Sequence, residues 1–121
     1  KKTPYPSPYI LDVVYAQITD LYEDLGNLNK AIEYTRKSIE VLETIDDSWW
    51  LGIRYSFLGY KYADVEQWDN AINNWKQAAI IFEKLGDYDK VLSMWSHICG
   101  QYRLMADFEK SIIYGEKYYN Y

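Results

Sequence analysis

The sequence repeats itself every 40 residues, and this repetition limits the fold more than any other feature. The segment from Tyr22 to Ile32 has counterparts at residues 62–72 and 102–112. Six columns keep one register: Tyr15/Tyr55/Trp95, Ile18/Leu58/Ile98, Tyr22/Tyr62/Tyr102, Leu28/Trp68/Phe108, Ala31/Ala71/Ser111 and Ile32/Ile72/Ile112. A chain of 121 residues with this period is expected to stack similar units on one another and so build one continuous core.

Each repeat contains two amphipathic segments. In the second repeat, apolar residues recur at spacings of three and four, which is one face of an α-helix: Leu51, Tyr55, Leu58 and Tyr62, then Trp68, Ala71, Ile72, Trp75, Ala78, Ala79 and Phe82. No sustained alternation of polar and apolar residues occurs, so strands are not expected. The pattern predicts helices at about 8–25, 28–45, 48–65, 68–85, 88–105 and 108–120.

Polar residues precede the predicted helices at equivalent places. The first helix of each repeat follows Ser7, Asp47 or Asp87, and the second follows Asn27, Gln67 or Asp107. All except Gln67 are favoured as N-caps, because a short side-chain oxygen accepts a free backbone N–H of the first turn. Small residues are expected where two helices cross, with large ones beside them: Ala31, Ala71, Gly59 and Cys99, then Tyr62, Trp68, Trp75 and Phe82.

The composition excludes several classes of function. The net charge is −5 without a basic stripe, which argues against nucleic acid and against an anionic membrane surface. No apolar run approaches the roughly 20 residues of a membrane span, and no signal peptide is expected after Lys1 and Lys2. Because the chain lacks an initiator Met, we expect a piece of a longer protein. Its one unpaired cysteine, Cys99, fits a cytoplasmic location.

Catalytic, metal and cofactor sites are not expected. His97 and Cys99 are two residues apart on a predicted helix, so their side chains point in different directions. Asp20, Glu23 and Asp24 form one helical turn of carboxylates, and no further ligand is in view. No glycine-rich phosphate loop occurs. The sequence therefore predicts a chain that is not an enzyme and has no cofactor.

The repeat columns resemble the tetratricopeptide repeat. Its aromatic, Leu, Gly, Tyr, Ala and aromatic positions are matched in the second repeat by Tyr55, Leu58, Gly59, Tyr62, Ala71 and Trp75, followed by Ala78. Thr19 and Thr35 are off-pattern in the first repeat, and Cys99, Gly115 and Tyr118 in the third. The 40-residue period is similar to the long-repeat subclass that includes kinesin light chain. The resemblance implies an all-α, right-handed α-solenoid with three helix-turn-helix units, at about 8–47, 48–87 and 88–121, and six antiparallel helices in a single domain.

The resemblance also implies a concave groove that is lined by the first helices and binds a protein or peptide. The expected contact residues are Asp20, Asp24, Phe57, Tyr60, Asp64, His97 and Arg103. Phe57 and Tyr60 are expected to lack a core partner, because they are large aromatics on the concave face of a first helix. A basic partner with an apolar anchor would suit this mixture of carboxylates and aromatics, although a solvated helix face explains the acidic turn better. The family's carboxylate-clamp positions here carry Ala16, Asp20, Phe57, Ser93 and His97, which lack the required Lys and Asn. We therefore reject a carboxylate clamp.

The tyrosines of the last helix suggest an alternative of another class. Tyr114, Tyr118, Tyr119 and Tyr121 crowd a helix that no later repeat in the sequence covers. Terminal units of solenoids normally carry a polar face, so an uncovered apolar face is expected either where the native chain continues or where this face contacts another copy. Under this alternative the array is a structural or self-associating spacer within a larger regulatory or enzymatic protein, with homo-oligomers formed through its terminal helices.

Overall fold

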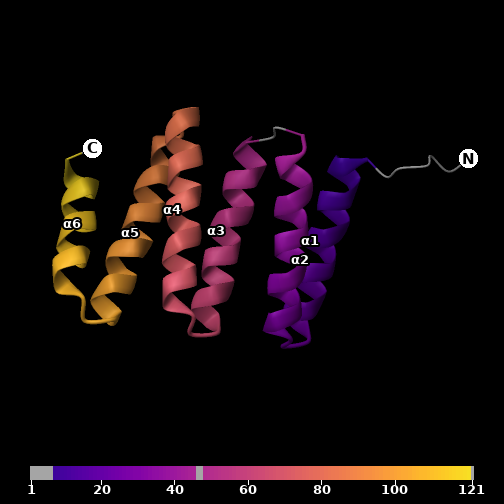
Figure 1. Cartoon of the computed structure of the whole chain (residues 1–121), viewed down its shortest axis with the longest axis horizontal. Helices are drawn as coiled ribbons and strands as arrows, with labels where there is room; N and C mark the ends of the chain where they lie inside the picture. The colour runs from indigo at the N-terminus through magenta and orange to yellow at the C-terminus, as the bar shows by residue number, and fades with distance from the viewer. Residues whose placement is uncertain (1–6, 46–47, 121) are drawn as a thin grey trace, which may run out of the picture.

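The chain folds into a row of antiparallel helical hairpins. The structure, a computed structural model, describes residues 7–45 and 48–120. Within these ranges six helices follow one another: α1 (Pro8–Asp24), α2 (Leu28–Glu43), α3 (Ser48–Asp64), α4 (Trp68–Leu85), α5 (Tyr88–Leu104) and α6 (Phe108–Tyr119). Consecutive helices lie side by side along the long axis of the molecule, with α1 and α6 at its opposite ends (Figure 1). The predicted all-α helical solenoid is confirmed.

The turn inside each hairpin has the same backbone conformation. Gly26, Glu66 and Ala106 are 40 residues apart, and their φ angles are 76°, 62° and 60°. After each of them, the next backbone N–H donates to the carbonyl of a tyrosine near the end of the first helix: Asn27 to Tyr22, Gln67 to Tyr62 and Asp107 to Tyr102. This left-handed helix end favours glycine, which only the first hairpin supplies.

The predicted N-caps are only partly correct. The side chains of Asn27 and Asp107 accept the backbone N–H of Lys30 and Lys110, as predicted. Ser7 and Asp87 make no capping hydrogen bond. The Asp87 carboxylate instead accepts the indole N–H of Trp49 at 3.1 Å, because α3 begins close to it. Gln67 also makes no capping bond, as expected, and Asp47 lies outside the described residues.

The core follows the repeat columns in the middle of the row. The buried residues there include Leu58, Tyr62, Ala71, Ile72 and Trp75. The side chains of Phe82 and Ile98 have no exposed surface. Trp68 was expected to fill space beside the helix crossing, but 36% of it is exposed. As the first residue of α4, it lies at the edge of the hairpin, where packing surrounds only part of its ring.

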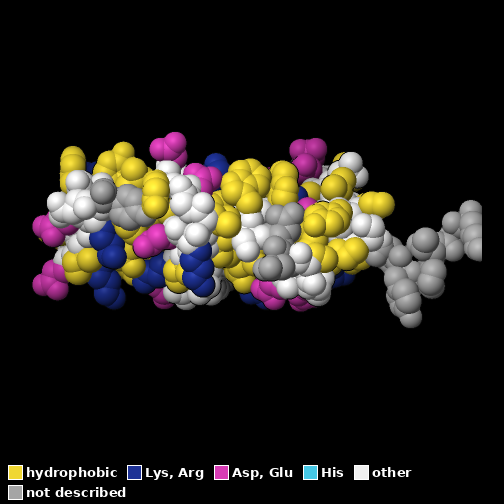
Figure 2. Space-filling view, turned by 90° about the horizontal axis from the view of Figure 1, so that it is seen from above, with side chains coloured by type: hydrophobic (Ala, Val, Ile, Leu, Met, Phe, Trp, Pro, Cys, Tyr) yellow, Lys and Arg dark blue, Asp and Glu magenta, His cyan; other side chains and the backbone are white. Residues whose placement is uncertain are grey.

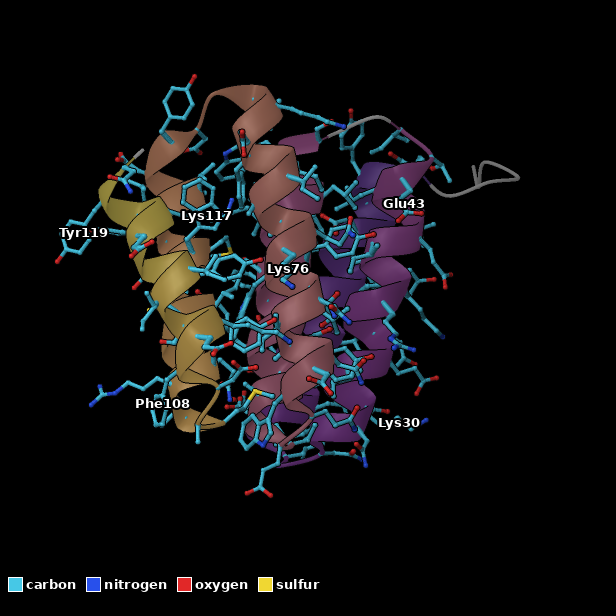
Figure 3. All side chains as sticks on the ribbon, turned by 60° about the vertical axis from the view of Figure 1, so that its left-hand side comes forward. Lys30, Glu43, Lys76, Phe108, Lys117 and Tyr119 are labelled. Carbon is cyan, nitrogen blue, oxygen red and sulfur yellow. The ribbon has the colours of Figure 1, made fainter. Side chains whose placement is uncertain are left out.

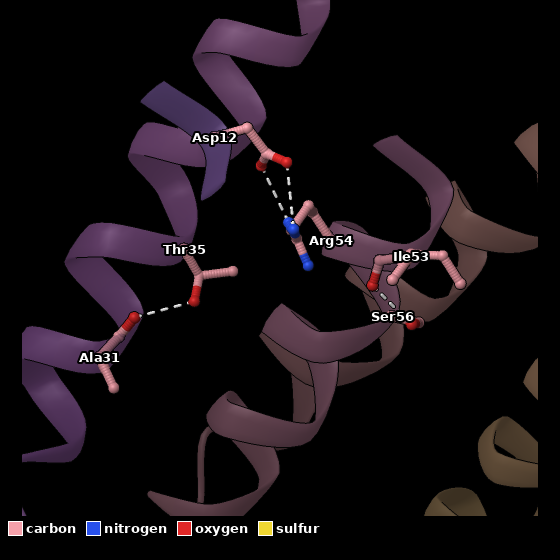
Figure 4. Close-up of polar contacts among 6 residues, drawn as sticks. All are labelled: Asp12, Ala31, Thr35, Ile53, Arg54 and Ser56. Carbon is pink, nitrogen blue, oxygen red and sulfur yellow. Dashed lines mark hydrogen bonds and ion pairs between the residues drawn. The ribbon is translucent and has the colours of Figure 1, made fainter. Parts of the chain in front are cut away.

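A buried ion pair fixes the first hairpin to the second. Asp12 of α1 accepts two hydrogen bonds from Arg54 of α3, from Nε at 3.0 Å and from Nη2 at 3.1 Å (Figure 4). The side chains are only 8% and 11% exposed. A paired geometry of this kind fixes orientation as well as distance. It therefore sets how α1 lies against α3.

Candidate functional site

A hollow lies between α3 and α5, on the first-helix surface where the groove is predicted. Its volume is about 230 Å³, and it is here called the groove pocket. The walls combine apolar and polar side chains from both helices, together with one ring from α4: Ile53, Ser56, Phe57, Tyr60, Phe82, Asp89, Lys90, Ser93 and Met94. Phe57 is 42% exposed at this surface, so its ring is accessible to a partner.

Tyr60 and His97 join the second and third hairpins at this surface. The Tyr60 hydroxyl and His97 Nε2 are hydrogen-bonded at 2.8 Å. The His97 ring stacks on the buried indole of Trp75 with centroids 5.6 Å apart, and Tyr60 meets Trp75 edge-on at the same distance. Burial raises the pKa of Tyr60 and lowers the pKa of His97, since it disfavours both charged forms. Both groups are therefore neutral near pH 7.

This geometry corrects one expectation about the aromatic contact residues. Phe57 and Tyr60 were expected to lack a core partner. For Tyr60 this is wrong, because its ring packs on Trp75, which belongs to the core. Phe57 is different: its neighbours include the cationic groups of Lys61 and Arg54, which lie 5.5 and 6.0 Å from the ring centroid. Phe57 is thus the predicted aromatic that is open to a partner.

The predicted charged contact residues do not form one cluster. Asp20 is exposed on α1 and lines a second hollow together with Phe57 of α3. Asp24, Asp64 and Arg103 are exposed in the last turns of α1, α3 and α5 and take no part in the Tyr60–His97 contact.

Glu23 was expected to add negative charge to the groove, but it is paired. Lys61 of α3 reaches Glu23 with Nζ at 2.6 Å from Oε1. The free carboxylates at this end are therefore fewer than the sequence suggested, because a basic residue from the next hairpin neutralises one of them.

The tyrosines of α6 lie in different environments. Tyr114 is half-buried, and its ring centroid lies 5.9 Å from that of Tyr102. Tyr118 lines a hollow together with His97 and Ser96. Tyr119 is 88% exposed and points away from α6 (Figure 3). Tyr121 lies outside the described residues. Of the tyrosines of α6 that the structure describes, Tyr118 and Tyr119 therefore present an open aromatic surface.

Other apolar residues of α6 are also exposed, and one of them, Ile112, belongs to a repeat column that is buried in the earlier hairpins. Ile112 is 59% exposed, whereas Ile32 and Ile72 in the same column are buried. Phe108 and Ile113 are exposed as well. The reason is geometric: α2 and α4 each pack against the helix that follows them, whereas α6 is the last described helix. Hydrophobic side chains accordingly reach the surface at both ends of the row (Figure 2).

Among residues 7–45 and 48–120, no three His, Cys, Asp or Glu side chains are grouped so that they could hold a metal ion. Within the same ranges, no helix has the length and apolarity needed to span a bilayer.

The sequence reasoning missed the Asp12–Arg54 pair and a polar cavity behind it. The cavity is lined by Thr19, Thr35 and Ser38, whose hydroxyls interrupt the small-residue and aromatic columns of the repeat. Thr19 and Thr35 are visible in the sequence as departures from the pattern, so a signal was present. Nothing in the sequence pairs Asp12 with Arg54, which are 42 residues apart.

Comparison by sequence finds no matching family model and no matching curated protein. Comparison by structure finds similar solved domains. The tetratricopeptide-repeat domain of Arabidopsis FLU superimposes with a TM-score of 0.81 at 13% identity, over 93% of this chain and 95% of that one. The N-terminal domain of stress-induced protein-1 (STI-1) from C. elegans gives a TM-score of 0.79 at 12% identity, over 94% and 86%.

BtubC from P. vanneervenii is also similar, with a TM-score of 0.81 and 16% identity over 97% of this chain. This chain spans 48% of the length of BtubC. At such identities the likeness concerns the fold. Together with the 40-residue register and the shared turn, it shows that this chain has the fold of tetratricopeptide-repeat domains.

Proposed function

We propose that this chain is a non-catalytic protein-interaction module that binds a segment of a partner along the surface of α1, α3 and α5. The observation that carries the proposal is the groove pocket beside the exposed ring of Phe57. A volume of about 230 Å³ accepts one large apolar side chain of a partner. Phe57 and Tyr60 then contact the apolar side chain that the partner inserts into the groove pocket, and the Tyr60 ring is held in place by Trp75.

The charges near the anchor support a partner with a basic residue. Asp20 on α1 and Asp64 on α3 are exposed, and the whole chain carries a net charge of −5. The charges of the groove pocket itself balance, since one acidic residue, Asp89, and one basic residue, Lys90, both line it. A Lys or Arg of the partner would therefore lie beside the pocket, toward Asp20 or Asp64. Its charge would raise the association rate and orient the partner more than it would raise the affinity.

Selection of displayed peptides against this chain tests the proposal. We expect a consensus with one large apolar residue and a neighbouring Lys or Arg. Phe57→Ala should weaken binding of the selected peptide at least tenfold, since it removes one wall of the anchor pocket. Phe108→Ala is the matched control, because Phe108 is also an exposed phenylalanine, at 61%, but lies on α6.

Tyr60 is a poorer choice for truncation, because its ring supports Trp75 and His97. Tyr60→Phe removes only the hydroxyl bonded to His97 and keeps the packing. If no peptide is enriched, or if Phe57→Ala and Phe108→Ala bind a selected peptide equally, the groove is not the recognition surface.

The exposed apolar face of α6 supports a second candidate, self-association through the end of the row. Phe108, Ile112, Ile113 and Tyr119 are each more than half exposed. A surface of this kind on the last hairpin can stack on another copy. Sedimentation at rising protein concentration should then show dimers, and Tyr119→Glu should abolish them. Tyr88→Glu, at an exposed tyrosine of α5, is the control substitution. A chain that stays monomeric across the whole concentration range contradicts this candidate.

A further inference from the structure

The first hairpin contains a polar cavity at a place where the second hairpin contains a ring. The cavity has a volume of about 100 Å³ and lies between α1, α2 and α3. It is here called the hydroxyl pocket, and its lining is Ala16, Thr19, Asp20, Thr35, Ser38, Arg54, Phe57 and Lys61. Its size equals the liquid volume of about three water molecules, which is room for a molecule as small as glycine or alanine.

The repeat register explains why the cavity exists. The positions of Gly59, Trp75 and Ala78 in the second hairpin are held by Thr19, Thr35 and Ser38 in the first. In the second hairpin the Trp75 indole fills the space against Gly59, where an added Cβ would lie 2.4 Å from Nε1. The first hairpin lacks this ring. The third hairpin has Gly115 at the position that corresponds to Trp75, and a hollow lined by Cys99 and Gly115 is present there too.

Two hydroxyls of the pocket have no hydrogen-bond partner within the described residues. Thr19 Oγ1 and Ser38 Oγ are both enclosed, and the residues are 5% and 0% exposed. Thr35 differs, since its hydroxyl donates to the Ala31 carbonyl at 2.9 Å (Figure 4). An enclosed hydroxyl without a partner costs free energy, which Gly59 and Ala78 avoid in the second hairpin. A ligand that bonds both hydroxyls removes this cost.

The charged groups of the pocket limit the ligand further. Arg54 uses Nε and Nη2 to hold Asp12, and its remaining N–H groups stay available for another acceptor (Figure 4). Lys61 is held by Glu23. Asp20, the one carboxylate of the lining, is exposed at the mouth. The interior thus offers donors, and the mouth offers a negative charge.

We propose that the hydroxyl pocket binds a small zwitterion, an α-amino acid of the size of glycine or alanine. Its carboxylate lies inward and accepts hydrogen bonds from Thr19, Ser38 and Arg54. Its ammonium group lies at the mouth beside Asp20. A simple anion would meet the Asp20 carboxylate at the mouth, and a simple cation would offer no acceptor to the donors of Thr19, Ser38 and Arg54. A zwitterion satisfies both ends.

Titration of the chain with L-alanine, followed by amide chemical shifts in heteronuclear NMR spectra, tests this proposal. We expect saturable shifts in α1, α2 and α3. Acetate and methylamine each carry half of the recognised groups, and each should bind at least tenfold more weakly. Ser38→Ala and Thr19→Val should each reduce the affinity for L-alanine about fivefold or more, because each removes one hydrogen bond. Ser96→Ala, at an exposed serine of α5, should leave it unchanged.

Stability separates loss of binding from loss of folding. Ser38→Ala removes an unpartnered hydroxyl and introduces the residue found at position 78, so its urea midpoint should stay the same or rise. The proposal is overturned if L-alanine causes no saturable shifts. It is also overturned if acetate binds as tightly as L-alanine, or if Ser38→Ala and Thr19→Val bind L-alanine as tightly as the unmodified chain.

Discussion

Gly59 is the position where a single methyl group should disturb the core most. An ideal Cβ at Gly59 lies 2.4 Å from Nε1 and 2.5 Å from Cδ1 of Trp75. Ordinary contacts between such atoms are about 3.5–4.0 Å, so the overlap is about 1 Å. The indole cannot move aside freely, since Trp75 is only 3% exposed and is held between Tyr60 and His97.

Gly59→Ala should therefore destabilise the chain despite the better helix propensity of alanine. Overpacking of this severity costs about 3 kcal/mol, and the gain in helix propensity returns about 1 kcal/mol. The expected net loss is about 2 kcal/mol. Gly100→Ala is the matched control in α5, because no atom lies within 4 Å of its added Cβ. It should gain about 0.5–1 kcal/mol from propensity alone.

Urea denaturation followed by circular dichroism measures both variants. The stability difference of about 3 kcal/mol corresponds to midpoints that are separated by about 2 M, for a denaturant slope near 1.5 kcal/mol/M. The Gly100→Ala midpoint should lie above that of the unmodified chain, and the Gly59→Ala midpoint below it. Equal midpoints for the two variants would refute the reasoning, because the α3–α4 crossing would then have room for a methyl group.

Three further predictions concern the ion pair, the hairpin turns and the histidine. Asp12→Ala should lower the free energy of unfolding, measured by urea denaturation, by about 3–5 kcal/mol, because it leaves the Arg54 charge buried without its partner. Lys30→Ala breaks an exposed ion pair and should leave the free energy of unfolding almost unchanged. Ala106→Gly should stabilise the folded chain by about 1 kcal/mol, because φ is 60° at this position and a residue with a Cβ is strained there. A lower melting temperature of this variant would contradict the prediction. Because the pKa of His97 is lowered in the folded state, the unfolded chain binds its proton first. Stability should therefore fall as the pH drops from about 6.5 toward the lower folded pKa, and His97→Gln should remove this slope, since the chain has no other histidine.

Much of the fold is predictable because it depends on local patterns that occur three times. The spacing of apolar residues specifies each helix, and the ends observed at Asp24, Asp64 and Leu104 lie within one residue of those expected. The capping of α2 and α6 is also local, since Asn27 and Asp107 bond to backbone only three residues away. Where a neighbour from another hairpin competes, prediction fails, as at Asp87, which bonds Trp49.

The candidate site is less predictable, because its properties depend on contacts between hairpins. The sequence predicts Phe57, Tyr60 and His97 as contact residues of one surface. In the structure Phe57 and Tyr60 line the groove pocket, and Tyr60 is hydrogen-bonded to His97. It does not indicate that Tyr60 rests on Trp75 or that Lys61 neutralises Glu23. Whether the seven predicted residues contact a partner stays a prediction, which the peptide selection tests.

The sequence by itself determined the helices and the turns, which follow from residues within a few positions of one another. It also determined the stacking of hairpins, which follows from columns that recur every 40 residues. The tertiary structure decided which member of a column is buried: Ile72 is enclosed between hairpins, whereas Ile112 is open on α6. It also decided that Thr19, Thr35 and Ser38 surround a cavity rather than a ring. The physical reason is that burial, charge pairing and cavity shape are properties of surfaces that meet, and these surfaces come from segments about 40 residues apart.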